Sequence, residues 1–171
     1  MKFLIASDIH GSAYWCEKLC RLIEAEQPDR LLLLGDLLYH GPRNDLPRDY
    51  APKAVIPMLS QYQQIILAVR GNCEAEVDQM VLPFPCLADC AMVFADGLSL
   101  YLTHGHHHNP ENLPPLPQGS VFLFGHTHVK MDEVHGGIRC LNPGSVSIPK
   151  DGSHSCLILE DGNFSFRVLE E

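Results

Sequence analysis

Phe3-Leu4-Ile5-Ala6-Ser7-Asp8-Ile9-His10-Gly11 is the stretch around which the rest of the chain is organised. Its apolar first half predicts a buried strand, and the Gly-Ser pair after His10 predicts an abrupt end in a loop. Side chains alternate along an extended chain, so we expect Asp8 and His10 to project to the same side. A carboxylate and an imidazole side by side make half of a metal site. The alternative is that Asp8 caps a loop and His10 is an ordinary polar loop residue.

Two more apolar runs have the same form as the first. The run 31–34 ends in Gly35-Asp36, and the run 65–69 ends in Gly71-Asn72. Between the first two runs, apolar residues at helical spacing behind Ser12 predict a capped helix over 13–26. Strand, helix and strand make a βαβ unit with a right-handed crossover, which indicates the α/β class. Ligands in open α/β sheets gather at the carboxyl ends of strands, which is where these polar residues stand.

The second half of the chain has the pattern of strands and hairpins. An Asp-Gly turn joins the runs 91–95 and 98–102, and the second run leads into Thr103-His104-Gly105-His106. The run 121–124 predicts another buried strand, which ends in Gly125-His126-Thr127-His128. The remaining expectations are a helix over 54–62, Pro-rich loops over 39–52 and 109–118, turns at 136–137 and 142–145, and a hairpin of 155–160 with 163–169. No linker or repeat interrupts this pattern, so we predict one domain over residues 1–171.

Composition narrows the classes of function. The formal net charge of −9 argues against a non-specific nucleic-acid binder, because such a protein needs a basic face. The seven Cys are odd in number and follow no signal-peptide pattern, so we expect reduced thiols in a cytoplasmic protein. No apolar run approaches the length that spans a membrane. A phosphate-bearing substrate stays compatible with the acidic balance, because bound cations can supply positive charge locally.

Seven polar residues at or just beyond the ends of the apolar runs form a candidate metal site. They are Asp8, His10, Asp36, Asn72, His104, His126 and His128. Mixed oxygen and imidazole ligands favour Mn²⁺, Fe²⁺, Zn²⁺ or Ni²⁺ over Ca²⁺, and among these we expect manganese. Seven ligands are too many for one ion with an open position, and they suit two ions about 3.5–4 Å apart that share a carboxylate. Such a pair clamps phosphate oxygens and makes hydroxide from water near neutral pH.

The motifs Asp-x-His, Gly-Asp, Gly-Asn-x-Glu, His-Gly-His and Gly-His-x-His, in this order, resemble those of the calcineurin-like metallophosphoesterases over residues 3–149. The stretches 35–44, 68–80, 102–106 and 141–150 look most similar to the bacterial YfcE-like phosphodiesterases of that family. The resemblance implies a four-layer α/β/β/α sandwich of two mixed sheets with helices outside. It also implies ligand roles: Asp8, His10 and His128 for the first metal, Asn72, His104 and His126 for the second, and Asp36 as the bridge.

One position departs from the family pattern. Many members carry a His directly after the Gly-Asn pair, where it acts on the leaving group, and this chain has Cys73 there. A neutral thiol is a poor general acid, so diesters with a good leaving group suit the site best. We name Cys73 and His106 as candidate catalytic residues. His106 would contact the substrate phosphate or protonate the leaving oxygen, and the alternative is a solvated loop residue.

The loop behind the second apolar run holds the candidate substrate-binding residues His40, Arg43 and Asn44. The alternative there is a purely structural loop turn. The tight turn over 142–145 is expected to support the site from behind without touching substrate. His107 and His108 are expected to lie on the surface of their loop.

These inferences predict a metal-dependent phosphoric diester hydrolase in which a metal-bridging hydroxide attacks phosphorus in line. The expected partner is a small phosphodiester, with no membrane and no non-specific nucleic acid, and the family resemblance implies a homo-oligomer, either a dimer or a tetramer. Two alternatives stay open. One is a catalytically weak, protein-binding scaffold of the same fold, as in the vacuolar-sorting type of retromer subunit. The other is a phosphomonoesterase or nuclease of the same family.

Overall fold

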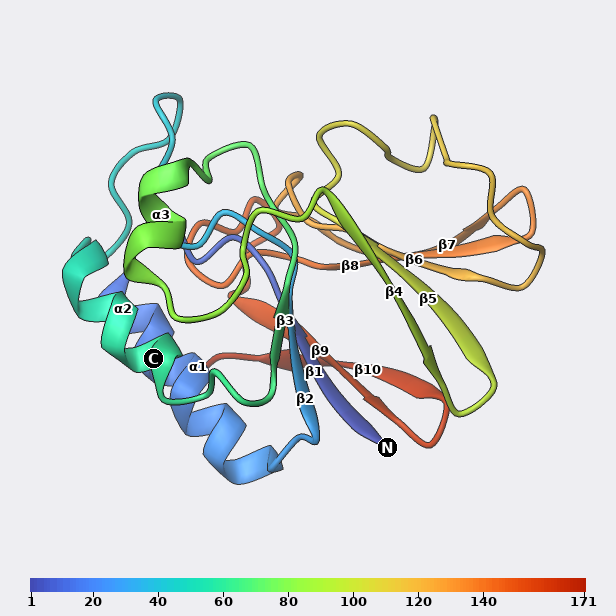
Figure 1. Ribbon diagram of the computed structural model, residues 1–171, viewed down its shortest axis with the longest axis horizontal. Helices are drawn as coiled ribbons and strands as arrows, with labels where there is room; N and C mark the ends of the chain where they lie inside the picture. The colour runs from blue at the N-terminus through green and yellow to red at the C-terminus, as the bar shows by residue number, and fades with distance from the viewer.

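The computed structural model describes residues 1–171, which form two five-stranded sheets and three helices (Figure 1). The strands are β1 (Lys2–Ala6), β2 (Arg30–Leu33), β3 (Ile66–Ala68), β4 (Cys90–Ala95), β5 (Leu98–Thr103), β6 (Val121–Leu123), β7 (Lys130–His135), β8 (Ile138–Pro143), β9 (Ser155–Glu160) and β10 (Asn163–Val168). The helices are α1 (Ala13–Glu26), α2 (Pro52–Ser60) and α3 (Glu76–Val81). The strand order is β10-β9-β1-β2-β3 in the first sheet and β4-β5-β6-β8-β7 in the second.

Each sheet is mixed, which confirms the expected fold class. The strands β1, β2 and β3 run parallel in the first sheet, as do β5, β6 and β8 in the second. The flanking strands β9, β10, β4 and β7 pair antiparallel. The carboxyl ends of the parallel strands therefore lie along one edge of each sheet, where polar turns can meet.

Strand alternation explains why the first sheet is apolar on both faces. Along β1, Phe3 and Ile5 enter the core between the two sheets, while Leu4 and Ala6 enter the core under the helices. The same division holds for β2 and β9, whose successive side chains go to opposite cores. A strand that is buried on both faces needs a continuous apolar run rather than an alternating one. This is the physical basis of the runs that the sequence displays.

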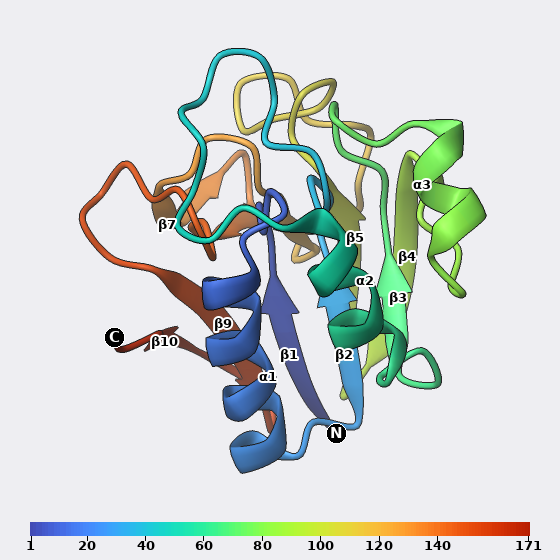
Figure 2. The ribbon, with the colours of Figure 1, turned by 90° about the vertical axis from the view of Figure 1, so that its left-hand side faces the viewer.

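Helix α1 forms as the sequence predicts and packs on the outer face of the first sheet (Figure 2). Ser12 is its N-cap, and its Oγ accepts a hydrogen bond from the Trp15 N–H at 3.3 Å. Trp15, Leu19 and Ile23 form the buried stripe. Helix α2 contributes Val55 to the same core. None of the helices has the length and apolar character needed to cross a membrane.

The outer face of the second sheet differs from the expected helical layer. Phe122 and Phe124 of this face pack against Leu113 and Leu116, which belong to the Pro-rich connection between β5 and β6. Prolines remove backbone donors and end helices, so this connection covers the sheet as an irregular segment. The helices lie on the other side of the molecule (Figure 1).

Two local expectations also change. Helix α3 was not predicted, because it has no buried residue and so leaves no apolar stripe in the sequence. Strand β8 continues through Asn142 and Pro143, so the turn expected at 142–145 begins only at Gly144.

Candidate metal centre

The turns at the strand ends carry an unusual backbone. Among the seven expected ligands, positive φ angles occur at Asp8 (59°), His10 (48°), Asp36 (56°), His126 (67°) and His128 (60°). A non-glycine residue in this region is strained, and such strain costs on the order of 1–3 kcal/mol per residue. Main-chain hydrogen bonds hold the turns in place, including Asp8 N–H to the Gly35 carbonyl at 3.1 Å and His10 N–H to the Asp36 carbonyl at 2.9 Å.

This geometry corrects one step of the sequence argument. Asp8 and His10 do converge, but not through the alternation of an extended strand. Strand β1 ends at Ala6, and both residues lie beyond it in left-handed turn conformations. The convergence therefore depends on backbone strain that a period-two pattern does not contain.

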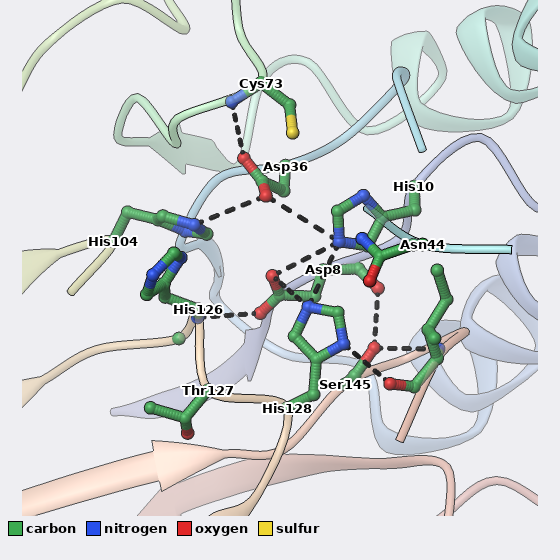
Figure 3. Close-up of polar contacts among 12 residues, drawn as sticks. Asp8, His10, Asp36, Asn44, Cys73, His104, His126, Thr127, His128 and Ser145 are labelled. Atoms are coloured by element: carbon green, nitrogen blue, oxygen red, sulfur yellow. Dashed lines mark hydrogen bonds and ion pairs between the residues drawn. The ribbon is translucent and has the colours of Figure 1, made fainter. Parts of the chain in front are cut away.

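The first group of converging side chains is Asp8, His10 and His128, all buried (Figure 3). Asp8 Oδ1 lies 3.1 Å from His128 Nε2 and 3.5 Å from His10 Nε2. The two Nε2 atoms are 3.2 Å apart. Asp8 Oδ1 is buried and has no hydrogen-bond partner despite these neighbours. A carboxylate oxygen and two imidazole nitrogens aimed at one point are arranged as ligands of a shared cation.

The second group surrounds Asp36. Its Oδ2 lies 3.4 Å from His104 Nε2 and 3.7 Å from His10 Nε2, so the carboxylate lies between the two groups (Figure 3). Asn72 Oδ1 is 3.1 Å from His104 Nε2. The His126 ring stands 5.1 Å from the His104 ring, centroid to centroid. All seven expected ligands thus gather at one place, with Asp36 Oδ2 between His10 and His104. We call the five that are buried, namely Asp8, His10, Asp36, His104 and His128, the inner cluster.

Main-chain carbonyls fix the orientation of three of the imidazoles. The Nδ1 atoms of His10, His104 and His128 face the carbonyls of Tyr39 (2.8 Å), Leu34 (2.7 Å) and Ile148 (2.6 Å). An Nδ1–H that donates to a carbonyl leaves Nε2 as the lone-pair donor, and this arrangement orients histidines that bind metals. The donor set, its tautomers and the orphaned Asp8 oxygen therefore fit divalent metal ions.

Charge in the metal-free cluster is set by competition between burial and pairing. Burial alone lowers the pKa of His104, but its hydrogen bond to Asp36 and the charges of Asp8 and Asp36 outweigh it and raise the pKa to about 9. Burial alone would raise the pKa of Asp8 and Asp36, yet the surrounding histidines lower both. Both carboxylates are therefore charged at neutral pH. For His126, burial and the neighbouring His104 lower the pKa.

Glu74 holds the turn that carries Asp36. Its buried carboxylate accepts the N–H groups of Asp36 (2.9 Å) and Leu37 (2.7 Å), and also that of Gly71. A Cβ at Gly71 would stand 2.1 Å from Asp36 Oδ1, so only glycine allows this close approach. Burial and the Asp36 charge raise the pKa of Glu74, against the three N–H groups that favour its charged form. The Gly-Asn-x-Glu motif contained this residue, but the sequence argument gave it no role.

Side chains from residues 142–147 support the turns that carry Asp8 and His126. Ser145 Oγ and Ser147 Oγ donate to the Asp8 carbonyl at 2.9 and 3.1 Å. Asn142 Nδ2 donates to the Gly125 carbonyl at 2.7 Å and so holds the turn that carries His126. These contacts agree with the prediction that residues 142–145 support the site without touching substrate.

A cavity of about 570 Å³ opens onto the cluster and is lined by eight residues, none of them hydrophobic. Arg43 and Asn44 belong to its wall, as the sequence suggested. His40 does not. Its ring stands edge-on between those of Tyr39 and Tyr50, at 4.7 and 5.0 Å. The wall also includes Thr127 and Lys150, which the sequence argument did not single out. We call the exposed or half-buried residues Arg43, Asn44 and Lys150 the rim.

The two candidate catalytic residues differ in position. Cys73 lies at the cluster, where its N–H donates to Asp36 Oδ1 at 2.9 Å, and burial and the Asp36 charge raise the pKa of its thiol. His106 lines a second cavity of about 510 Å³, which has Phe124 in its wall and shares His126 with the first. Burial and the neighbouring histidines lower the pKa of His106 to about 4, and its buried Nδ1 has no partner. At neutral pH His106 is therefore neutral and can donate an N–H but not act as an imidazolium.

Comparisons with known proteins agree with this geometry. A family model described as the calcineurin-like phosphoesterase superfamily domain matches residues 1–162. Phosphodiesterase YfcE of Escherichia coli strain K12 is 49% identical over 153 residues, which cover 90% of this chain and 83% of the relative. A solved structure of the E. coli phosphoesterase YfcE matches with a TM-score of 0.92 at 43% identity, covering 99% of this chain and 100% of that chain.

More distant relatives extend the comparison. The probable metallophosphoesterase YsnB of Bacillus subtilis is 26% identical over all of this chain and 92% of its own length. A structure of Vps29 from Entamoeba histolytica has a TM-score of 0.63 at 18% identity, covering 98% of each chain. That likeness concerns the fold alone.

Proposed function

The chain belongs to the calcineurin-like phosphoesterase superfamily, and from this premise we propose that it is a phosphodiesterase that uses two divalent metal ions. The observation that carries the proposal is the inner cluster. Its three imidazoles turn Nε2 inward because main-chain carbonyls hold Nδ1, and its two carboxylates lie among them. The name of the E. coli relative supplies the reaction class, the hydrolysis of a phosphodiester.

The proposed ligand roles follow the two groups of side chains. Asp8, His10 and His128 would hold the first ion, and Asn72, His104 and His126 the second. Asp36 would bridge, which is supported by the position of its Oδ2 between His10 and His104. Two bound ions supply positive charge that clamps phosphate oxygens, and they lower the pKa of water so that hydroxide is available near neutral pH.

The chain's own groups have three tasks in the proposed reaction. The strained turns and their hydrogen bonds fix the ligands before the substrate arrives, so little reorganisation is needed during reaction. The cavity admits the diester so that water attacks phosphorus opposite the leaving oxygen. His106, neutral at pH 7, donates an N–H to a phosphate or leaving oxygen. Cys73 has a raised pKa and stays a neutral thiol, so we propose that it neither attacks phosphorus nor protonates the leaving group.

The test is hydrolysis of bis(p-nitrophenyl) phosphate and p-nitrophenyl phosphate by metal-stripped protein, with and without added Mn²⁺. We expect cleavage of the diester only when the metal is present, and weak cleavage of the monoester. Strong monoesterase activity would instead make the protein a phosphomonoesterase. Failure to cleave either ester, despite two bound ions, would favour a catalytically weak, protein-binding scaffold of the same fold.

We further propose that the native metal is manganese and that the protein is cytoplasmic. Parallel additions of Zn²⁺, Fe²⁺ and Ni²⁺ test whether Mn²⁺ gives the highest rate, as we expect. All seven cysteines are free thiols, which supports a reducing cytoplasmic location. The proposed partner is a small phosphodiester, and dimers or tetramers remain the expectation from the family.

A further inference from the structure

The cavity over the metal centre has a composition that limits its substrates. None of its eight lining residues is hydrophobic. The neighbouring cavity, on the other side of His126, differs because Phe124 and Met131 contribute to its wall. Ligand pockets usually bury ligands against hydrophobic and aromatic side chains. A wall without hydrophobic side chains offers no apolar surface to an acyl chain, so a polar substituent suits this cavity better.

Two cationic side chains line this cavity, and they come from different loops. Arg43 belongs to the β2–α2 connection, which arches over the carboxyl ends of β1 and β2 (Figure 2), and Lys150 belongs to the β8–β9 connection. A local hydrogen bond holds each loop. The Lys150 N–H donates to the His128 carbonyl at 2.9 Å, and the Asn44 side chain next to Arg43 donates to the His40 carbonyl at 2.8 Å.

Neither cation is neutralised by the protein. Arg43 and Lys150 form no ion pair with a carboxylate, although the chain carries 21 Asp and Glu against 12 Lys and Arg. Some cations elsewhere are paired, such as Lys130 with Asp151 at 2.8 Å and Arg139 with Asp132 at 2.8 Å. Arg43 and Lys150 differ from the other unpaired cations because they line the cavity over the metal centre. The two free cations thus stand where the cavity opens, with their charges available to a ligand.

Charge balance then indicates what they bind. A phosphodiester carries one negative charge, and two divalent ions at the inner cluster already provide its counter-charge. Two more cations at the rim exceed that need. Arginine also matches a carboxylate or phosphate through two parallel N–H donors. Resting on the proposed function, we propose that the substrate is a small polar phosphodiester that carries a second anionic group, a carboxylate or phosphate, bound between Arg43 and Lys150.

The experiment uses three diesters with the same leaving group: p-nitrophenyl ethyl phosphate and its analogues with a 2-carboxyethyl or 2-aminoethyl arm. On Mn²⁺-loaded protein we expect the carboxyethyl ester to have a KM about tenfold below that of the ethyl ester, which corresponds to about 1.4 kcal/mol. The aminoethyl ester should have the highest KM. Added salt should reduce the differences, because exposed charges are screened.

The double variant Arg43→Gln/Lys150→Gln should bring the KM ratio of ethyl to carboxyethyl ester close to one. The matched control is Lys53→Gln on α2, which removes an exposed cation outside the cavity and should preserve the ratio. Calorimetric binding of ethyl and 2-carboxyethyl methylphosphonate, whose poor alkoxide leaving groups resist cleavage, should show the same preference without turnover.

Two results overturn the inference, and they differ from failure of the proposed function. A KM ratio near one in the unmodified protein, together with equal phosphonate affinities, shows that the rim does not select an anion. An unchanged ratio in the double variant shows that other groups select it. If none of the three esters is cleaved, the proposed function itself fails, and the inference loses its basis.

Discussion

The inner cluster and the rim lie on the same cavity but are built in opposite ways. Every residue of the inner cluster is buried. Main-chain carbonyls hold its imidazoles, the Glu74 carboxylate holds the Asp36 N–H, and the Ser145 and Ser147 hydroxyls hold the Asp8 carbonyl. Arg43 and Lys150 of the rim are exposed, lie on loops and have no carboxylate partner. The cluster residues lie in turns that directly follow the carboxyl ends of the parallel strands. The rim residues lie further along the loops that connect these strands to the next element. The proposed chemistry thus lies in the buried, hydrogen-bonded turns, and the proposed selection of substrate lies in exposed loops.

The inner cluster and the rim also differ in backbone strain. Strained residues persist only where the surroundings over-determine them. Around Asp8, two serine hydroxyls hold its carbonyl and Gly35 accepts its N–H. A change in the cluster should therefore affect metal, activity and stability together, while a change at the rim should alter only selectivity.

The largest effect is expected from Asp36→Asn. An amide in place of the bridging carboxylate removes the charge that both ions would share, so metal affinity and diester cleavage should fall together, the latter by more than about a hundredfold. Metal analysis and the bis(p-nitrophenyl) phosphate assay measure the two. Asp45→Asn, on the exposed part of the β2–α2 loop, is the matched control and should retain both. A variant of Asp36 that keeps full metal content and activity would disprove the bridging role.

A smaller effect on activity is expected from Glu74→Gln. The glutamine amide cannot accept all three N–H groups that the carboxylate accepts, so the turn of Asp36 should loosen. We expect about 1–3 kcal/mol less stability and about 10–100-fold lower activity. Urea unfolding and the diester assay test this. Glu76→Gln, an exposed residue at the start of α3, should behave like the unmodified protein. Equal behaviour of the two variants would show that the cluster does not depend on this support.

The pH dependence of the metal-free protein probes the same region. The pKa of His104 is about 9 in the folded protein, against an ordinary value of 6.5. The folded state holds this proton more tightly, so its contribution to stability is complete below about pH 6.5 and is lost as the pH rises through 9. The free energy of unfolding should fall across this range, and His104→Gln should flatten the fall. A stability that rises with pH over this interval would contradict the assigned charge state.

The smallest effect is expected from Cys73→Ser. Its thiol has a raised pKa and is neutral, and general acids contribute about 10²–10⁴-fold to rates where they act. We therefore expect the rate on bis(p-nitrophenyl) phosphate to change by less than about threefold. A loss of more than about tenfold in this rate would instead assign the thiol, which lies beside the cluster, a direct role in the reaction.

The sequence predicted the inner cluster well because its signals are local. Each ligand follows an apolar run, and such runs are required by strands buried on both faces, as β1 shows with Phe3 and Leu4 in different cores. The same logic located α1, because Ser12 caps it and its buried stripe has helical spacing. These features depend on neighbouring residues, which a sequence displays directly.

The sequence failed where the structure depends on contacts between distant residues. The positive φ of Asp8 follows from bonds to Gly35, Ser145 and Ser147, which no local pattern reveals. Lys150 reaches the cavity because its segment is bonded to His128. His40 was a candidate either for substrate binding or for a structural role in its loop, and its ring packs with two tyrosines outside the cavity wall. The positions of loop residues such as His40 and Lys150 are thus harder to predict than those of ligands at strand ends.

The most direct test of the central claim is an anomalous difference map from crystals of the Mn²⁺-loaded protein. Our account predicts two peaks about 3.5–4 Å apart within the inner cluster, with Asp36 touching both and Asn72 on the second. A single peak, or two peaks that Asp36 does not join, would contradict the assignment of this cluster as a two-metal centre.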